Sequence, residues 1–394
     1  MRKIIISLIL ILLLTGCWNY KELNNYCIVT GIAIDKADNG KYEVSFLISN
    51  SINNNSDTKD SESKIVVYSG KGKSIYEAIK NIGLITPKEL YIGHTSILII
   101  SDEIAKEGVS NVIDFFVRFP EVRKDFFVIL ARDCKAKDAL KVTTPLSSFP
   151  SQNIYENISS TSELQGVVYA LDFNHMLEIL LNKGQNITIN SIKILGNKKK
   201  GSSNENLEST QPKAMIKLDT LGIFKNDKFV KWTTKDESRG INILNNEMEE
   251  MYITIKYNDG YIVLKTESLK SKSKVKLINN SPAVDINIKA KTIITEVDSN
   301  IDLTDVNTTI KIQKLAEKEL VRIVNKAINL AKDEKTDILG FGELFYKKYP
   351  KYFKSVENNW HNDILPNVKT KVKCTINIDS KGTAKTSIKE KLDE

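Results

Sequence analysis

The sequence predicts an α+β fold in three domains. Strand-like and helix-like segments alternate between residues 65 and 140, the pattern of a sheet with helices packed on it. A polar segment without apolar periodicity, residues 197–212, interrupts this pattern. From about residue 249, alternating apolar and polar residues precede one long amphipathic helix. We therefore expect an N-terminal α/β domain at 17–186, a small middle α+β domain at 187–247 and a C-terminal α+β domain at 248–394.

Residues 1–16 have the features of a lipoprotein signal peptide. Arg2 and Lys3 precede an apolar run, 4–14, which is too short to span a bilayer because a spanning helix needs roughly 20 apolar residues. The run ends in Leu14-Thr15-Gly16-Cys17, which fits the bacterial lipobox, in which a diacylglycerol is attached to the cysteine thiol and the chain is cut before it. An ordinary signal peptide with an accidental cysteine, or a short membrane anchor, is the alternative. We expect a mature chain that begins at Cys17, held by lipid on the outer face of a membrane.

The N-terminal domain is predicted to begin with a hairpin. Two apolar or alternating runs flank Asp38-Asn39-Gly40, a combination typical of tight turns. Ser74 and Glu77 have the spacing of a capping box and predict the start of a helix. The other predicted elements are strands at 65–68, 91–100 and 126–132, and helices at 109–118, 135–140 and 171–181.

The middle domain is predicted from three strand-like runs and one helix. Runs at 187–195 and 214–224 surround 197–212, which we expect to be a mobile loop. The turn Asn226-Asp227 leads into a third run, and a helix is expected from about Thr234.

The C-terminal domain is predicted to combine an antiparallel sheet with the long helix 308–332. Apolar residues in this helix recur at spacings of three and four, with Lys, Glu and Arg on the other face. Asn258-Asp259-Gly260 between alternating runs is a hairpin signal. We also expect a helix at 342–349 and a closing hairpin of residues 367–378 and 383–388.

Composition favours a globular protein that works near a membrane. Apolar residues make up 41% and charged residues 27% of the chain, which allows a sizeable core. The net charge of +8 suits a nearby anionic membrane, whereas a nucleic-acid partner is not expected. Apart from Cys17, the cysteines lack the spacing of a disulfide framework or a metal site, and Cys27 and Cys374 are interpreted as small core residues.

No catalytic constellation is visible in the sequence, so we predict no enzyme activity, cofactor or metal. Gly70-Lys71-Gly72-Lys73-Ser74 lacks the first glycine of a phosphate-binding loop, whose place is taken by Val67, and its glycines are interpreted as turn residues. The histidines, His94, His175 and His361, have no partners at metal-ligand spacing. A Gly-x-Ser-x-Gly motif is absent.

Aromatic residues cluster between Phe341 and Phe353, with Trp360 shortly after. Phe341, Phe345 and Tyr349 share one helical face, which favours packing against the long helix. The alternative is a partner-binding patch with a basic rim. Its candidate partner-facing residues are Tyr349, Tyr352, Lys347 and Lys351.

Short motifs that occur in order along the chain carry a resemblance. They are Cys17-Trp18-Asn19 with Lys21-Glu22-Leu23, Gly93-His94-Thr95, Leu221-Gly222-Ile223-Phe224, Glu237-Ser238-Arg239-Gly240, Asp337-Ile338-Leu339-Gly340-Phe341-Gly342 and Tyr349-Pro350-Lys351-Tyr352, followed by Trp360. Together they resemble the C-subunit lipoproteins of spore germinant receptors. The chain departs from the family pattern at Lys231-Trp232, where Gly-Trp is expected, and at Phe353, where Trp is commoner.

The resemblance implies three domains, each a β-sheet flanked by α-helices, in agreement with the breaks above. It implies a non-enzymatic subunit on the outer face of the spore inner membrane, required for germination in response to small nutrients. Its partners would be the integral-membrane A and B subunits, and the bilayer through diacylglycerol on Cys17. The germinant, the stoichiometry, the surface that meets A and B and any direct ligand contact are not implied.

Two other classes remain as alternatives. A lipid-tethered solute-binding protein of a transporter needs a two-lobed α/β body, which the β-rich final third and the separate middle unit disfavour. An envelope hydrolase needs a nucleophile or a metal set, and neither is visible.

Overall fold

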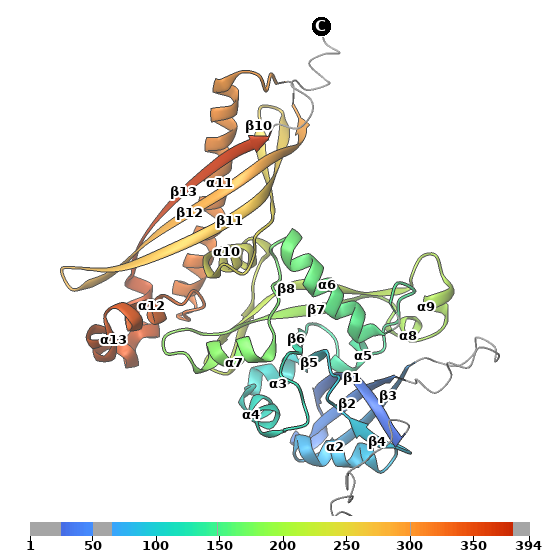
Figure 1. Ribbon diagram of the computed structural model, residues 1–394. Coiled ribbons are helices and arrows are strands. Elements are labelled where there is room, and N and C mark those ends of the chain that lie inside the picture. Colours follow the sequence, from blue (N-terminus) through green and yellow to red (C-terminus); the bar gives the residue numbers. More distant parts are fainter. Residues whose placement is uncertain (1–24, 50–64, 148, 300, 381–394) are drawn as a thin grey trace, which may run out of the picture.

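The computed structural model describes residues 25–49, 65–147, 149–299 and 301–380. They form two β-sheets with α-helices packed against them, which confirms the α+β class (Figure 1). The signal peptide and Cys17 lie outside the described residues. Within these ranges, no helix is both long and apolar enough to cross a membrane.

The larger sheet of the described chain has nine strands in the order β3-β2-β1-β5-β6-β7-β8-β9, with β4 paired to β1 outside this path. Neighbours among β1, β5, β6 and β7 are parallel, whereas β1-β2-β3 and β7-β8-β9 are antiparallel. The strands are β1 (Tyr26–Lys36), β2 (Tyr42–Ser49), β3 (Ile65–Gly72), β4 (Glu89–Tyr91), β5 (Ile97–Ser101), β6 (Phe127–Ala131), β7 (Thr188–Gly196), β8 (Ala214–Lys225) and β9 (Lys228–Trp232).

Helices cover both faces of the parallel part of this sheet. β5 is buried at every position: Leu98 and Ile100 belong to one core, and Ile97 and Ile99 to a second core on the other face. An apolar run without alternation suits a strand buried on both faces. The helices of this region are α2 (Ile75–Gly83), α3 (Asp102–Glu107), α4 (Ser110–Arg118), α5 (Ala136–Ala139), α6 (Pro150–Leu164) and α7 (Phe173–Leu181).

The strands of residues 187–247 join the larger sheet instead of forming a sheet of their own. β7 pairs in parallel with β6, with Asn190 opposite Ile129, and β8 and β9 extend the sheet further. The crossover through α5, α6 and α7 brings β7 beside β6, so the backbone groups of β6 gain a second hydrogen-bonded neighbour. The structure therefore has two sheets where a sheet in each of three domains is expected. The three domain boundaries remain a prediction.

Residues 197–212, expected to be a mobile loop, contain two short helices, α8 (Lys198–Gly201) and α9 (Glu205–Glu208). Asn197 caps α8 by accepting hydrogen bonds from two backbone N–H groups. The fully buried Asn206 side chain accepts a hydrogen bond from the N–H of Ala214 and donates to the carbonyl oxygen of Thr143. Asparagine side chains thus organise a segment that lacks apolar periodicity, and its mobility remains a prediction.

Gly70 and Gly72 lie within β3, so their interpretation as turn residues is wrong. A Cβ at Gly70 would stand 2.2 Å from the carbonyl oxygen of Ala78, and a Cβ at Gly72 would stand 2.5 Å from the nitrogen of Ala78. The absent side chains let β3 approach α2 closely. Ser74 then caps α2 by accepting a hydrogen bond from the N–H of Glu77, as its spacing predicts.

The smaller sheet has the order β10-β11-β12-β13 and is formed by long strands (Figure 1). β10, β11 and β12 are antiparallel, but β13 runs parallel to β12, so the predicted fully antiparallel sheet is wrong at this edge. The chain reaches β13 through a helical crossover rather than a hairpin, which sets the parallel direction. Residues 383–388 of the expected closing hairpin lie outside the described residues. The strands are β10 (Tyr252–Tyr257), β11 (Gly260–Ile278), β12 (Ser281–Asp298) and β13 (Lys369–Ser380).

The predicted long helix is observed as α11 (Val306–Asp333), with Asp305 as its N-cap. Its apolar stripe is buried, and it packs against β13, β10 and α10 (Lys235–Asn245). Thr234 and Glu237 form a capping box at the start of α10, where a helix is predicted. After α11, the chain forms α12 (Phe341–Lys348) and α13 (Pro350–Val356), followed by short helical turns up to Asn367.

Candidate functional site

The family-like motif that begins at Asp337 surrounds a buried carboxylate. Asp337 is fully buried, and its Oδ1 accepts hydrogen bonds from the N–H groups of Leu339 (3.3 Å) and Phe341 (3.0 Å). Its Oδ2 accepts from the N–H of Gly342 (2.6 Å) and from Nε1 of Trp360 (2.7 Å). The carboxylate therefore binds free N–H groups at the start of α12, which is the favourable end of a helix for negative charge.

Burial and hydrogen bonding act on this carboxyl group in opposite directions. Burial raises the pKa of Asp337 to about 6, although the N–H groups of Gly342, Trp360, Phe341 and Leu339 each lower it. At neutral pH the group is therefore ionised and can accept all four hydrogen bonds.

Glycines allow the backbone to close around Asp337. Gly340 has a φ of +67° and forms the N-cap of α12, a left-handed conformation that suits glycine. A Cβ on Gly342 would stand 2.6 Å from the carbonyl oxygen of Gly184 and 2.7 Å from Nε1 of Trp360. The start of α12 thus lies directly against the loop that precedes β7.

The same segment connects the larger sheet to the helical region between α11 and β13. The carbonyl oxygen of Asp337 accepts a hydrogen bond from the N–H of Asn186 (2.8 Å), next to β7. The Thr336 hydroxyl donates to the carbonyl oxygen of Phe224 (2.6 Å) in β8. The N–H of Asp337 donates to Nδ1 of His361 (3.3 Å). We call the residues Asn186, Phe224, Thr336, Asp337, Trp360 and His361 the junction.

His361 contributes a neutral imidazole to the junction. Burial lowers the pKa of His361, and the nearby positive charge of Lys225 lowers it further. A neutral ring can accept a hydrogen bond at Nδ1, which fits the N–H donated by Asp337. A surface pocket of about 440 Å³ opens beside the junction and is lined in part by Asn186, Trp360 and His361.

The predicted partner-facing residues lie at the margin of this region. Tyr349 and Tyr352 are half-buried, with ring centroids 6.2 and 6.0 Å from that of the buried Phe345. Lys347 and Lys351 are exposed, and Lys347 forms an ion pair with Glu343 (2.5 Å). The structure thus brings all four residues to α12 and α13, and their role towards a partner remains a prediction.

The aromatic residues between Phe341 and Phe353 are mainly buried in the core, but they do not pack mainly against the long helix as expected. Phe341, Phe345 and Phe353 are buried, and the rings of Phe345 and Phe353 lie 5.4 and 5.3 Å from that of Trp360. The main neighbours of α12 are α13 and β11 rather than the long helix α11. Residues 334–340, which include the left-handed Gly340, separate α12 from the end of α11.

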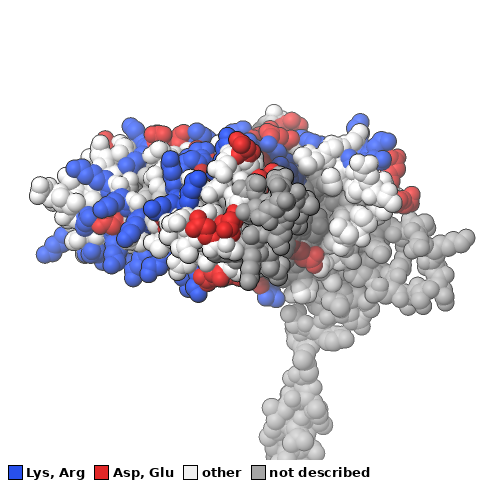
Figure 2. Space-filling model, turned by 90° about the horizontal axis from the view of Figure 1, so that it is seen from above, with Lys and Arg blue, Asp and Glu red and all other residues white. Residues whose placement is uncertain are grey.

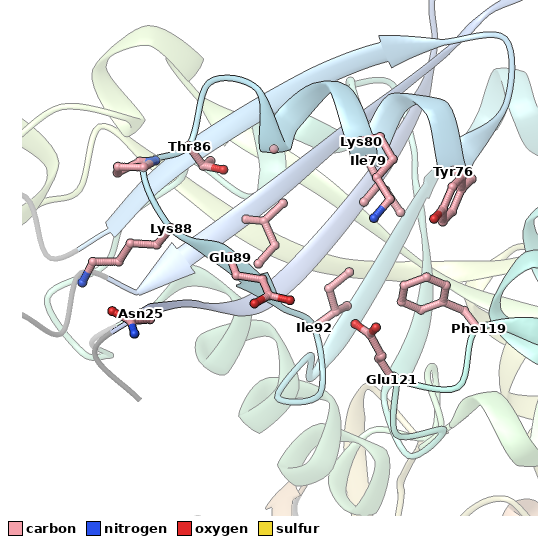
Figure 3. A pocket seen from close by; sticks show the side chains of 13 residues that line it. Asn25, Tyr76, Ile79, Lys80, Thr86, Lys88, Glu89, Ile92, Phe119 and Glu121 are labelled. Atoms are coloured by element: carbon pink, nitrogen blue, oxygen red, sulfur yellow. The ribbon is translucent and has the colours of Figure 1, made fainter. Parts of the chain in front are cut away.

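A second pocket lies at the other end of the described chain and measures about 590 Å³. Figure 3 shows Lys80 of α2, Glu89 of β4 and Glu121 around it, with Tyr76 and Phe119 on one side. Asn25, the first described residue, also lines this pocket. The lining mixes both charge signs and carries no nucleophile with an adjacent base.

The described residues provide no cluster for metal chemistry. No group of three or more His, Cys, Asp or Glu side chains within the described ranges could hold a metal ion. The three other cysteines are free thiols packed against the two cores. Burial raises the pKa of Cys134 to about 11 and of Cys374 to about 12, so these thiols stay protonated at neutral pH. Cys27 and Cys374, interpreted as small core residues, are half-buried and pack against the margin of the core.

Taken together, the fold and the junction define a mixed α/β scaffold in which buried polar contacts join the larger sheet to the helical region before β13. Residues 19–194 match the spore germination protein N-terminal domain family, and residues 219–382 match the spore germination B3/GerAC-like C-terminal family. The chain therefore belongs to the spore germinant receptor C-subunit family, and this membership supports a role in spore germination.

The relatives span almost the whole chain. Spore germination protein KC of Bacillus subtilis (strain 168) is 27% identical over 396 residues, covering 98% of this chain and 97% of that protein. Spore germination protein B3 of the same organism is 22% identical, covering 91% of this chain and 92% of that protein. The crystal structure of the GerBC protein has a TM-score of 0.54 at 18% identity and covers 89% of this chain and 97% of that chain, which supports the fold.

Sequence reasoning missed the role of Asp337 within its motif. One signal was available, because an aspartate shortly before a glycine-containing helix start is a capping signal. The contacts of Asp337 with Asn186 and Trp360 carried no such signal, since they join residues far apart in the sequence.

Proposed function

We propose that this chain is the lipid-anchored, non-enzymatic C subunit of a nutrient germinant receptor. In this proposal, diacylglycerol on Cys17 holds the chain on the outer face of the spore inner membrane. Integral-membrane A and B subunits are its partners, and the complex triggers germination in response to small nutrients. The observation that carries the proposal is the pair of family matches, which together extend from residue 19 to residue 382 in the expected order.

The signal segment supports the membrane part of the proposal. Arg2, Lys3 and the apolar run 4–14 lead directly into Leu14-Thr15-Gly16-Cys17. A diacylglycerol supplies two acyl chains, and two chains hold a protein stably to a bilayer, whereas one chain does so only marginally.

The experiment is affinity isolation of the tagged full-length chain from detergent-solubilised spore membranes, with mass spectrometry of its partners and of its N-terminal peptide. The proposal expects A-type and B-type germination subunits and a lipid on Cys17. A Cys17→Ala chain is the matched control, and its N-terminal peptide should carry no lipid. Recovery of a transporter permease instead would support the solute-binding alternative and overturn the receptor proposal.

We further propose that α12 and α13 form part of the surface that meets A and B. Tyr349, Tyr352, Lys347 and Lys351 are clustered there at the surface, next to the junction. Lys347→Glu with Lys351→Glu should release the partners without changing the fold, because both side chains are exposed. Tyr349→Ala with Tyr352→Ala should do the same. Tyr155→Ala is the control. Tyr155 is also a partly exposed tyrosine, but it belongs to α6, and its ring stacks on Phe127 of the larger sheet.

Unfolding of the double tyrosine variant, measured by circular dichroism, would mean that those rings are core residues. Normal co-purification of the double lysine variant would overturn this assignment of the surface.

A further inference from the structure

The outer face of the smaller sheet carries a dense array of lysines. We define the lysine face as Lys270, Lys272, Lys274 and Lys276 on β11, Lys289 and Lys291 on β12, and Lys369, Lys371 and Lys373 on β13. All nine are exposed except Lys276, which is half-buried. The opposite face of the same strands carries apolar residues such as Ile286, Ile288 and Ile376, which belong to the core around α11.

The register of the strands places these lysines side by side. Lys270 lies opposite Lys289, while Lys272 and Lys373 both lie opposite Asn287. From Ser268 to Ile278, the pairing of β11 with β12 has no register shift, so the positions alternate regularly between the two faces. Figure 2 shows Lys and Arg side chains gathered at the end of the molecule that this sheet occupies.

Few acidic groups neutralise the lysine face. Asp285 lies within it and forms an ion pair with Lys276 (2.6 Å), and Asp379 lies 3.6 Å from Lys291 at its border. The nine lysines thus exceed these two aspartates by seven charges, compared with a net +8 for the whole chain. The excess positive charge is therefore concentrated on one sheet face.

Protection of a sheet edge does not account for this pattern. Lysines on an edge strand prevent unwanted strand pairing, and β13 is an edge strand. Lys289 and Lys291, however, lie on β12, which has neighbours on both sides. Like charges directly opposite each other destabilise a sheet, as at Lys270 and Lys289. A negatively charged partner would relieve this repulsion.

We propose that the lysine face binds the surface of an anionic phospholipid bilayer. The face consists of lysines without arginine, and lysine is a hydrated point charge that suits many headgroups without bidentate geometry. Each lysine close to an anionic leaflet adds to such binding. Within residues 268–278, 283–293 and 369–378, which form the lysine face, there is no aromatic ring, and a surface for single-stranded nucleic acid would need such rings for base stacking.

This proposal goes beyond subunit membership, because it gives the body of the chain its own contact with the membrane. Asn25, where the described chain begins, lines the pocket at α2 and β4, at the opposite end of the molecule from the smaller sheet (Figure 1). A lipid tether before Asn25 and the lysine face would thus touch the bilayer at separate places. Two separate contacts would fix the orientation of the body on the membrane.

The test measures binding of the full chain, carrying Cys17→Ala, to vesicles of phosphatidylcholine with or without phosphatidylglycerol. The variant combines Lys272→Gln, Lys289→Gln and Lys373→Gln, one exposed lysine from each strand. The matched control combines three exposed lysines of the larger sheet region, Lys41→Gln, Lys217→Gln and Lys228→Gln. All three chains contain the same apolar segment 4–14, so a difference between them reports on lysine positions.

We expect an affinity that increases with phosphatidylglycerol and decreases as ionic strength rises. The lysine-face variant should lose about fivefold in affinity for each lysine removed, on the order of 100-fold in total, and the control should lose far less. Equal losses in both variants, or an affinity of the chain that does not increase with phosphatidylglycerol, would overturn the proposal. Loss of a protein partner by the lysine-face variant, with vesicle binding unchanged, would also overturn it in favour of an acidic protein. No A or B subunit takes part in the vesicle assay, so its outcome is separate from that of the co-purification test.

Discussion

The two sheets of this protein are buried in different ways. In the larger sheet, β5 packs against a helix-containing core on each face, with Ile99 in one core and Leu98 in the other. In the smaller sheet, β12 directs Ile288 into the core around α11, while its neighbour Lys289 faces solvent. The centre of the larger sheet is therefore closed on both faces, whereas the smaller sheet has one face available for a partner. Differences in burial predict where substitutions affect stability and where they affect binding.

The largest expected effect is in the closed sheet. Ile99→Ala should lower the free energy of unfolding by about 3 kcal/mol, because it leaves a cavity in a fully buried strand. Lys289→Ala, at an outward position of the inner strand β12, should change it by less than about 0.5 kcal/mol. Urea unfolding followed by circular dichroism measures both values. Similar losses of unfolding free energy in the two variants would mean that the two sheets do not differ in burial as described.

The junction between the larger sheet and the C-terminal helical region should rank second. Asp337→Ala would leave the N–H of Gly342 and Nε1 of Trp360 without their acceptor, at a cost of about 2 kcal/mol at neutral pH. Asp333→Ala is the control, since Asp333 is an exposed aspartate at the end of α11. If both variants unfold at the same urea concentration as the unmodified chain, the junction does not contribute to stability.

The same carboxyl group predicts a dependence on pH. The pKa of Asp337 is about 6 in the folded chain, above its ordinary value of 3.8, so the folded state binds this proton more tightly. Its contribution to stability is fully present below about pH 4 and is lost as the pH rises through about 6, by at most about 1.4 kcal/mol per pH unit. Urea titrations across this window should show that slope for the unmodified chain and a smaller one for Asp337→Ala. Identical slopes would contradict the raised pKa.

The smallest effect should appear on the lysine face itself. Lys289→Gln should raise the free energy of unfolding by about 0.3 kcal/mol at low salt, because it removes the repulsion from Lys270. Lys276→Gln should lower it by a similar amount, since it breaks the ion pair with Asp285. Both changes should fade at high salt. A loss of stability in Lys289→Gln would mean that Lys289 has a stabilising contact within the fold.

Local patterns predicted the class of the fold and many of its elements. The period of apolar residues located α11, and the spacing of Ser74 and Glu77 located the start of α2. The pairing between strands that are distant in the sequence could not be predicted from local patterns. Whether β7 joins β6 or forms another sheet depends on which edge is free, and the direction of β13 depends on the helices that precede it.

The same limit applies to the candidate sites. Alternating lysines at 270–276 and 369–373 are visible in the sequence. Their union into one face depends on the pairing of β11, β12 and β13, which joins segments about one hundred residues apart. The junction is similar, because Asp337 and Asn186 are about 150 residues apart in the sequence and meet only in the tertiary fold. Sequence patterns thus indicate which residues share one face of a strand or helix. Only the tertiary fold shows which of these faces and residues come together in a site.

Residue-resolved lysine labelling would test the central contrast between the two sheets most directly. The full chain would be acetylated by an amine-reactive reagent, with and without phosphatidylglycerol vesicles, and each lysine quantified by mass spectrometry. We predict that the vesicles protect Lys272, Lys289 and Lys373 from acetylation, while Lys217 and Lys228 stay reactive. Equal protection of both groups, or no protection of the lysine face, would contradict it.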